Sequence, residues 1–315
     1  MLFRSVSEYA ASMGGSQVFL EPGETQTVET MIKCISVASA NDACVAMAEY
    51  LCGSESEFVR QMNERARGLG MKDTTFVNCC GLDTEGHMTS AYDVALMSRE
   101  LTVNHPEIHN YCTIWMENIT HMMARGSSEF GLTNTNKLLR SYDGCDGLKT
   151  GSTSKALFCI SATAEREGME LIAVILKGKT SPERFADAQT LLNYGFATYA
   201  LKTVVPEGPL PPVPVRLGTQ ATVQPVLGEE NQLLLEKAKT GELGQSVTLE
   251  PSVQAPVAVG DRLGTLTVTS GGEVLAELPL LAGEEVPRIT FRQMLPRVLR
   301  DRKSTRLNSS HYSRS

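Results

Sequence analysis

The sequence predicts an α+β domain followed by a small all-β domain. Apolar residues recur at helical spacing between residues 24 and 101, and two strand-like runs then precede a long amphipathic helix. Five prolines crowd into residues 206–214, which suits neither a helix nor a central strand. Beyond them, short segments alternate apolar and polar residues, as half-buried strands do.

The first helices are predicted from their apolar faces and from the residues at their ends. The apolar face of the first helix comprises Val28, Met31, Ile32 and Ile35, and positions 43, 44, 47, 48 and 51 repeat this spacing in a second helix. Gly53 ends the second helix, and Ser54 or Ser56 begins a third that runs to about residue 67. Ser90 and Asp93 resemble a capping box, which predicts a helix over residues 92–101.

A hairpin and a long helix complete the first domain. Residues 157–164 and 169–177 are strand-like, and the polar turn at residues 165–168 joins them. Both strands are almost continuously apolar, so we expect the hairpin to be covered on both faces. An amphipathic helix is expected from Pro182 to about Tyr199.

The proline-rich stretch determines the expected domain boundaries. We expect a first domain over residues 6–203, a linker over 204–214 and a β domain over 215–287. Residues 288–301 are basic and weakly amphipathic, so they either begin a membrane-surface segment or form a solvated tail. Residues 1–5 and 302–315 resemble translated adapter sequence, and we expect both ends to be non-native.

Composition excludes several classes of function. The net charge of −7 disfavours a nucleic-acid partner, and no apolar run reaches the length of a membrane span. The first residues are not a signal peptide, because they lack an apolar core. The eight cysteines contain no C-x-x-C pair and are interpreted as buried thiols. The five histidines form no ligand pattern, since Pro106 separates His105 from His109, so no metal or other cofactor is implied.

Lys149-Thr150-Gly151 is the first candidate binding motif. It leads into the predicted strand at residues 157–164, where a lysine supplies charge for a carboxylate and a threonine supplies a hydrogen bond. Glycine lets a substrate backbone lie against the strand, and the backbone N–H of Ser152 can face a developing oxyanion. A second copy at residues 239–241 is interpreted as the end of a helix or hairpin closed by glycine, because it opens no buried strand.

Ser39-Ala40-Asn41 is the second candidate motif, between the two predicted helices. The serine can relay a proton, and the asparagine amide can bind a substrate carbonyl. The alternative is that Ser39 or Asn41 caps the helix over residues 42–51. The two roles are compatible.

Four segments occur in an order that resembles the low-molecular-mass D-alanyl-D-alanine carboxypeptidases. The segments are SANDACVAMA at residues 39–48, FVNCCGLD at 76–83, NTNKLL at 134–139 and DGLKTG at 146–151. The resemblance extends from about residue 8 to residue 199, and the β domain also resembles theirs. It implies a penicillin-binding, β-lactamase-like transpeptidase domain with an antiparallel sheet and helices, whose first elements are missing, followed by a small all-β domain.

The resemblance also implies an acyl-enzyme mechanism on the peptidoglycan pentapeptide stem, with β-lactam antibiotics as inhibitors. Ser39 would assist proton transfer, and Asn41 would hold the substrate amide. Lys149 and Thr150 would bind the terminal carboxylate. Arg184 would either add charge there or be an arginine on the helix surface. The enzyme would act outside the cytoplasmic membrane, attached to it, with the β domain as a spacer.

One departure from the family pattern bears on activity. The family's Ser-x-x-Lys nucleophile motif should precede Ser39, and residues 1–38 contain none. The one match in the chain, Ser152 to Lys155, has the wrong order and lies at an expected strand start, where positions i and i+3 face opposite ways. We therefore expect an N-terminally truncated, inactive chain. The alternatives are a β-lactamase or transpeptidase relative, and a non-catalytic penicillin-fold protein that binds the cell wall.

Overall fold

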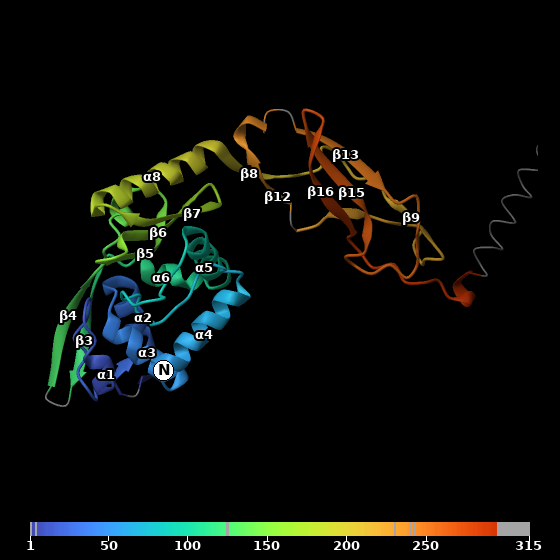
Figure 1. The fold of residues 1–315 in the computed structure, drawn as a ribbon. Helices are drawn as coiled ribbons and strands as arrows, with labels where there is room; N and C mark the ends of the chain where they lie inside the picture. Colours follow the sequence, from blue (N-terminus) through green and yellow to red (C-terminus); the bar gives the residue numbers. More distant parts are fainter. Residues whose placement is uncertain are drawn as a thin grey trace, which may run out of the picture. The chain divides into compact units, whose positions relative to one another are not determined.

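The computed structural model describes residues 2–3, 5–123, 126–229, 231–239, 241 and 243–294. The chain divides into two compact units, Met1–Ala197 and Thr198–Ser315 (Figure 1). This division precedes the expected boundary at residue 203, because strand β8 (Tyr199–Thr203) pairs with β12 (Gln232–Glu236) of the second unit. The expected linker begins with Val204, which is buried and donates a backbone hydrogen bond to Asn231 O at 2.8 Å.

The predicted helices are present in the first unit. They are α2 (Val28–Ala38), α3 (Asn41–Cys52), α4 (Glu55–Gly68) and α5 (Ala91–Asn104). Gly53 ends α3 with φ of 80°, a left-handed conformation that glycine adopts without steric cost. The Ser54 and Ser90 hydroxyls accept the backbone N–H of Glu57 and Asp93, at 3.1 and 3.2 Å. These local caps explain why the helix starts were predictable.

The helices bury one apolar core around α2 and α3. Its members include Met31, Cys34 and Val37 of α2 and Ala43 and Ala46 of α3, each at most 1% exposed. The helix α1 (Glu8–Ala11) packs against the same core through Ala10. Together these contacts fix the turn between α2 and α3, which carries Ser39.

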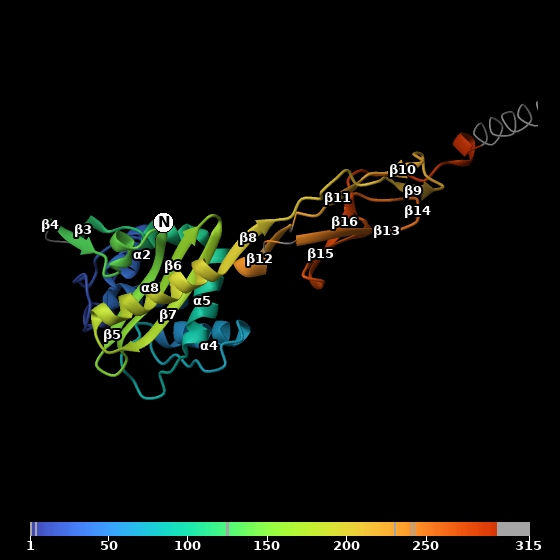
Figure 2. The same ribbon diagram turned by 90° about the horizontal axis from the view of Figure 1, so that it is seen from above.

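An antiparallel sheet in the order β5-β6-β7 forms the other half of the first unit. The strands are β5 (Cys145–Thr153), β6 (Leu157–Arg166) and β7 (Met169–Gly178). The predicted hairpin is β6–β7, and Lys149 precedes it as expected but lies inside β5, a strand that was not predicted. The helix α8 (Ser181–Thr198) lies on one side of this sheet and α5 on the other (Figures 1 and 2).

Several short elements of the first unit were not predicted. The strands β3 (Met116–Met123) and β4 (Gly126–Thr133) form a hairpin, and β1 (Leu2–Phe3) pairs with β2 (Gln26–Thr27). The short helical segments are η1 (Pro106–Ile108), α6 (His109–Cys112) and α7 (Leu138–Ser141). Apolar residues of β3 and β4 are scattered among polar residues and glycines, so neither strand shows a clear apolar run or alternation in the sequence.

The second unit is all β apart from one short 3-10 turn among its named elements. A sheet in the order β11-β16-β15-β13 packs with a smaller one in the order β10-β9-β14. The strands are β9 (Val213–Arg216), β10 (Thr222–Val223), β11 (Pro225–Leu227), β13 (Leu243–Leu249), β14 (Val253–Gln254), β15 (Arg262–Ser270) and β16 (Glu273–Ala282). Gly271 and Gly272 form the predicted β15–β16 turn with φ of 56° and 86°. The small all-β domain is thereby confirmed.

Three expectations concern the second copy of the lysine motif and the chain ends. Lys237–Lys239 forms the 3-10 turn η2 after β12, and Thr240 lies outside the described residues. Residues 288–294 of the expected membrane-surface segment are described, whereas 295–301 and the expected tail 302–315 are not. Within the described part of the chain, every helix is too short or too polar to cross a membrane.

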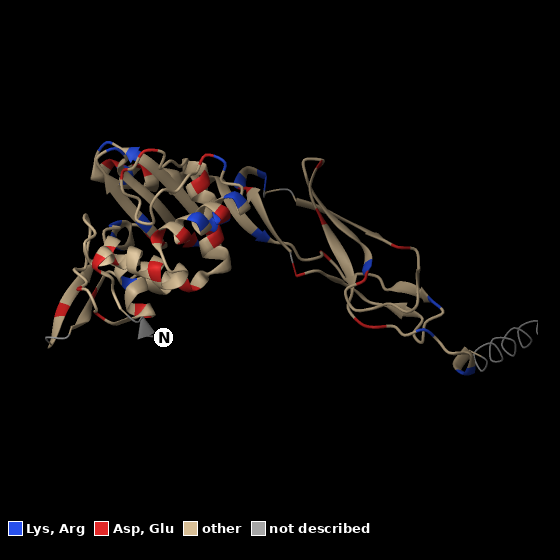
Figure 3. Cartoon of the chain, turned by 60° about the horizontal axis from the view of Figure 1, so that its bottom comes forward, with Lys and Arg blue, Asp and Glu red and all other residues tan. Residues whose placement is uncertain are grey.

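Acidic and basic residues are interspersed over the first unit (Figure 3).

Candidate active site

Lys149 occupies the middle of β5, at the edge of the three-stranded sheet. Among the described residues, β5 pairs with β6 alone, with Lys149 opposite Ser161. The Lys149 ammonium donates one hydrogen bond to Ser39 Oγ and another, of 2.7 Å, to the Thr150 carbonyl. Burial lowers the pKa of Lys149 to about 8, and the nearby Arg184 charge acts in the same direction. The structure therefore brings the two predicted motifs together through their first residues.

Ser39 faces Lys149 from the turn between α2 and α3. It ends α2 in the left-handed conformation, with φ of 57° and ψ of 37°, and its N–H donates to Cys34 O. The expectation that Ser39 or Asn41 caps the following helix is wrong, because Ala40 occupies the N-cap without a side-chain bond. A non-glycine residue in this conformation is uncommon and costs energy. The turn is held in place by the buried helices on both sides.

Asn41 follows Ser39 at the first position of α3 and is 7% exposed. Its side-chain amide donates a 2.7 Å hydrogen bond to Gly14 O, and its backbone N–H donates to Ser16 O at 2.8 Å. Asn41 thus fastens the segment at residues 14–16 against the start of α3. A contact between Asn41 and a substrate amide stays a prediction.

Thr150, Gly151 and Ser152 continue β5 beyond Lys149. Thr150 is 6% exposed, and its hydroxyl shares a hydrogen bond with the Thr135 hydroxyl. Gly151 is exposed, and an added Cβ there would meet no atom within 4 Å. Ser152 is also exposed. The strand therefore presents open space beside Gly151, where a peptide could lie against its backbone.

Arg184 is a buried residue in the first turn of α8, with 6% exposure. The alternative that it lies on the helix surface is therefore wrong. Its Nη1 donates to Gly151 O and to Cys159 O, both at 3.1 Å, so it bonds the backbone of β5 and β6. Its guanidinium carbon also lies 4.7 Å from the Phe185 ring centroid, a cation–π contact. These contacts position Gly151, and direct carboxylate binding by Arg184 stays a prediction.

Ser152 and Lys155 do not form a helical Ser-x-x-Lys pair. Ser152 lies near the end of β5, rather than at a strand start, and Lys155 lies in the turn to β6. Asp83 holds this turn, because its carboxylate accepts from Thr153 Oγ1 at 2.6 Å, from Ser154 Oγ at 2.9 Å and from Lys155 N at 3.0 Å. At a spacing of three residues, a serine and a lysine share one face in a helix but not in a strand.

Sequence reasoning missed several residues that hold the site together. Asp42 is 1% exposed, and its carboxylate accepts from Val18 N and Leu20 N at 3.1–3.3 Å. Asn136 is 1% exposed and donates to Gly147 O at 2.8 Å, two residues before Lys149. The signal in the sequence was that Asp42 and Asn136 belong to the quoted family segments, but their partners lie far away along the chain.

A group of thiols lies beside Lys149. A hydrogen bond from Cys80 lowers the pKa of Cys44, against the effect of burial, and the Lys149 charge lowers it further. Cys79 Sγ and Cys80 Sγ are 3.8 Å apart, and all eight cysteines are free. The expectation of uniformly buried thiols is wrong in part, since only Cys34 and Cys112 are buried and the other six are half-buried.

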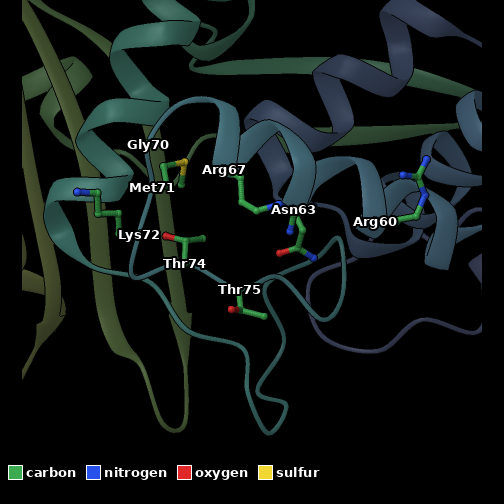
Figure 4. Close-up of a pocket in the computed structure, with 8 residues that line it drawn as sticks. All are labelled: Arg60, Asn63, Arg67, Gly70, Met71, Lys72, Thr74 and Thr75. Atoms are coloured by element: carbon green, nitrogen blue, oxygen red, sulfur yellow. The ribbon is translucent and has the colours of Figure 1, made fainter.

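An open pocket of about 730 Å³ lies over the end of α4 and the following turn (Figure 4). Its lining residues are Arg60, Asn63, Arg67, Gly70, Met71, Lys72, Thr74 and Thr75. None of the predicted site residues lines this pocket. The candidate active site is therefore defined by the contacts of Ser39 and Lys149, rather than by this pocket.

Comparison with protein-family models assigns both units. Residues 3–180 match the family described as D-alanyl-D-alanine carboxypeptidase, and residues 199–288 match the penicillin-binding protein 5 C-terminal domain. The second match coincides with the all-β unit. The predicted resemblance is confirmed in both parts of the chain.

Individual relatives agree with the family match. The chain is 39% identical to D-alanyl-D-alanine carboxypeptidase DacF of Bacillus subtilis (strain 168), over 94% of this chain and 75% of the relative. It is 33% identical to DacC of Escherichia coli (strain K12), over 88% of this chain and 68% of the relative. The crystal structure of penicillin-binding protein 5 from Haemophilus influenzae matches with a TM-score of 0.71 and 27% identity, over 90% and 83% of the two chains. The chain belongs to the D-alanyl-D-alanine carboxypeptidases, the serine peptidases among the low-molecular-mass penicillin-binding proteins.

Proposed function

We propose that the first unit binds the D-Ala-D-Ala end of peptidoglycan stem peptides between Ser39 and the free edge of β5, without forming an acyl-enzyme in this 315-residue chain. Lys149 and Thr150 bind the terminal carboxylate, and Ser39 and Asn41 form the opposite side. In a chain with a nucleophile, these groups serve hydrolysis of the terminal D-Ala.

The contact between Lys149 and Ser39 carries this proposal. A partly buried ammonium costs free energy unless polar groups satisfy it, and here a serine hydroxyl and a backbone carbonyl do so. Neither of these two hydrogen-bond partners is a carboxylate. An incoming carboxylate supplies the missing negative charge, and Thr150 adds a hydroxyl at the same strand edge. The open space beside Gly151 leaves room for the peptide backbone.

The inactivity of this chain follows from the chemistry of acyl transfer. A serine attacks the D-Ala-D-Ala carbonyl only when a base takes its proton, and the family places that base one helical turn away. The chain has this spacing only at Ser152 and Lys155, which lie across a strand end and a turn. Ser39 is hydrogen-bonded to Lys149, but it lies at the end of a helix and no lysine follows it three residues later. Binding without turnover is the consistent expectation.

The partners and location follow from the family. The relatives are named D-alanyl-D-alanine carboxypeptidases, and the structural neighbours include penicillin-binding proteins. We therefore propose peptidoglycan stem peptides as ligands, β-lactams as competitors at the same site, and a place on the outer side of the cytoplasmic membrane. Attachment to the membrane surface through residues 288–301 stays a proposal, as does the absence of a nucleic-acid partner.

A second candidate is a penicillin-fold protein that binds cell wall without catalysis, because the Ser39–Lys149 site offers binding groups and the described residues hold no helical Ser-x-x-Lys pair. A β-lactamase relative is less consistent with the second unit, which matches the penicillin-binding protein 5 C-terminal domain. The DNA upstream of codon 6 in other copies of the gene separates the first two candidates. An in-frame Ser-x-x-Lys there supports the enzyme, and its absence supports the non-catalytic protein.

Binding of a diacetyl-Lys-D-Ala-D-Ala peptide, followed by NMR of the full chain, tests the proposed site. We expect saturable shifts that weaken strongly in Lys149→Met and persist in Lys155→Met, which removes a nearby exposed lysine. A peptide with an amidated C-terminus should bind much more weakly, because it offers no carboxylate to Lys149. Equal binding of the acid and the amide, or unchanged binding by Lys149→Met, would contradict the proposal.

A further inference from the structure

Three metal-ligating side chains converge behind β5, apart from the Ser39–Lys149 contact. His109 comes from α6, Asp146 from the start of β5 and Glu170 from β7. One ligand atom from each lies within 4.8 Å of the others. Their side chains are 24%, 25% and 28% exposed, so the group is half-buried but open to solvent. The family assignment gives this cluster no role.

The hydrogen bonding of His109 fixes which ring nitrogen is free. Its Nδ1 lies 2.9 Å from the Asp146 carbonyl oxygen, which can only accept, so Nδ1 carries the proton. In the neutral ring, Nε2 then presents a lone pair. That nitrogen lies 3.7 Å from Glu170 Oε1. Two electron-pair donors therefore face each other across a gap, and either a proton on Nε2 or a metal ion between the two atoms would satisfy them.

Glu170 contributes a second, independent observation. Its Oε1 is buried and has no hydrogen-bond partner among the described residues. Buried polar atoms without partners are rare in folded proteins, because each costs free energy. A cation bound between this oxygen and the imidazole nitrogen would satisfy both atoms.

Asp146 completes the set. Its Oδ1 accepts a 2.6 Å hydrogen bond from Thr163 Oγ1, while its Oδ2 lies 3.8 Å from His109 Nδ1. The same residue thus offers a carboxylate oxygen and, through its backbone carbonyl, orients the imidazole. A carbonyl that fixes the tautomer of a ligating histidine is a recurrent feature of metal sites.

We propose that His109, Asp146 and Glu170 bind a divalent transition-metal ion, with Zn²⁺ as the best match. One imidazole and two carboxylates leave a fourth position for water, the three-ligand arrangement that Zn²⁺ accepts. The imidazole disfavours Ca²⁺ and Mg²⁺, which prefer oxygen ligands. The bound ion neutralises the paired carboxylates and satisfies Glu170 Oε1.

A bound ion would join three elements that are far apart in the sequence. Asp146 stands three positions before Lys149 on the same strand. Coordination would tie α6 and β7 to the beginning of that strand, so the first consequence is stability of the sheet. A metal that binds only the folded chain raises its melting temperature. This inference does not depend on the proposed stem-peptide binding.

Calorimetric titration of the full chain with Zn²⁺ alone, paired with thermal unfolding, tests the site. We expect one saturable site and a higher melting temperature with Zn²⁺. Loss of one ligand, in His109→Ala or Glu170→Gln, should weaken binding by roughly tenfold to hundredfold or more and remove the thermal shift. Glu170→Gln removes a buried charge while keeping the side chain's shape, so it keeps the test informative if His109→Ala does not fold.

His105→Ala is the matched control. His105 also has a carboxylate at 3.7 Å, from Glu107, but its side chain is 59% exposed and it belongs to no three-residue ligand group among the described residues. Zn²⁺ binding should be unchanged in this variant. Equal Zn²⁺ affinity in wild type, His109→Ala and Glu170→Gln would overturn the proposal, as would no saturable binding by the wild type.

A second group within the described residues, Glu55, Cys79 and Cys80, also has metal-ligating atoms within 4.8 Å of one another. Thiolates there would bind soft ions, so the test must separate the two groups. Co²⁺ in place of Zn²⁺ gives a sulfur-to-metal absorption band only with thiolate ligands. We expect no such band and unchanged Zn²⁺ affinity in Cys79→Ser. A band that disappears in Cys79→Ser, together with lost Zn²⁺ binding, would assign the metal to the thiols and overturn the histidine site.

Discussion

Lys149 and Ser39, 110 residues apart in the sequence, meet through a hydrogen bond from the ammonium to the hydroxyl. The lysine comes from the edge strand β5. The serine ends α2, and its own backbone is in the left-handed conformation. Neither element fixes this contact alone, because it requires α2, α3 and β5 to hold their positions. The pair therefore reports whether the candidate active site is assembled.

The partly buried Lys149 ammonium makes the stability of the fold depend on pH. Folding lowers the pKa of Lys149 from 10.5 to about 8, so the unfolded chain binds more protons between these values. The contribution of Lys149 to stability therefore rises with pH across that window. Below pH 8 the lysine is charged in both states, and the full cost of burying its charge opposes folding. The quantity to follow is the free energy of unfolding of the wild type minus that of Lys149→Met. We expect this difference to increase from pH 8 to pH 10.5. Urea titrations of both proteins at several pH values measure this difference, and a difference that stays flat across the window would contradict the prediction.

Asp42 should be a large contributor to stability near the site. Replacement by alanine leaves the buried Val18 and Leu20 N–H groups without their carboxylate acceptor. We expect Asp42→Ala to lower the free energy of unfolding by roughly 2–4 kcal/mol, from the cost of unsatisfied buried donors. Chemical denaturation measures the change. Asp187→Ala, at an exposed position on α8, is the control, and an equal effect of both variants would count against the proposed role of Asp42.

Arg184 should not be replaceable by lysine. The guanidinium donates to carbonyls on both β5 and β6 and stacks on Phe185. A lysine ammonium cannot reproduce this planar geometry, so we expect Arg184→Lys to lower the free energy of unfolding by about 1.5–3 kcal/mol. Arg60→Lys, at a half-exposed surface pair, should change it by less than about 0.5 kcal/mol. A neutral result for Arg184→Lys would remove its positioning role.

Gly151 should matter for binding more than for folding. A valine there projects into open space, so we expect the free energy of unfolding to change by less than about 0.5 kcal/mol. The same side chain occupies the space proposed for the stem peptide. The steric overlap would cost about 1–3 kcal/mol and weaken peptide binding roughly 10- to 100-fold. NMR titration measures the affinity. Gly208→Val, at another exposed glycine with open space, serves as control, and undiminished binding by Gly151→Val would place the peptide elsewhere.

Local signals allowed the sequence to predict the helices and the main hairpin. Ser54, Ser90 and Gly53 act within a few residues of the helix ends that they define, so their roles follow from chemistry along the chain. The turn at Gly271 and Gly272 is equally local. The order of the four family segments predicted the fold of the first unit, and the alternation of apolar and polar residues beyond the prolines predicted the all-β unit.

Contacts between distant segments were not predictable in this way. The side chain of Arg184 reads as a surface residue in a polar helix turn, but the structure buries it against β5 and β6. Ser39 reads as a cap for the next helix, whereas it ends the preceding one. The convergence of His109 and Glu170 depends on strand pairing, which spacing along the chain does not encode. Such sites require coordinates, because their energy comes from tertiary packing.

Intact-protein mass spectrometry after incubation with a fluorescent penicillin tests the central claim most directly. The claim is that this chain has the substrate-binding residues of a D-alanyl-D-alanine carboxypeptidase without its nucleophile. We expect the mass of the wild-type chain, and that of Ser152→Ala, to remain unchanged under conditions that fully acylate an intact family member. A stoichiometric penicilloyl adduct on the wild-type chain, mapped by peptide digestion to Ser39, Ser152 or any other serine, would contradict the claim.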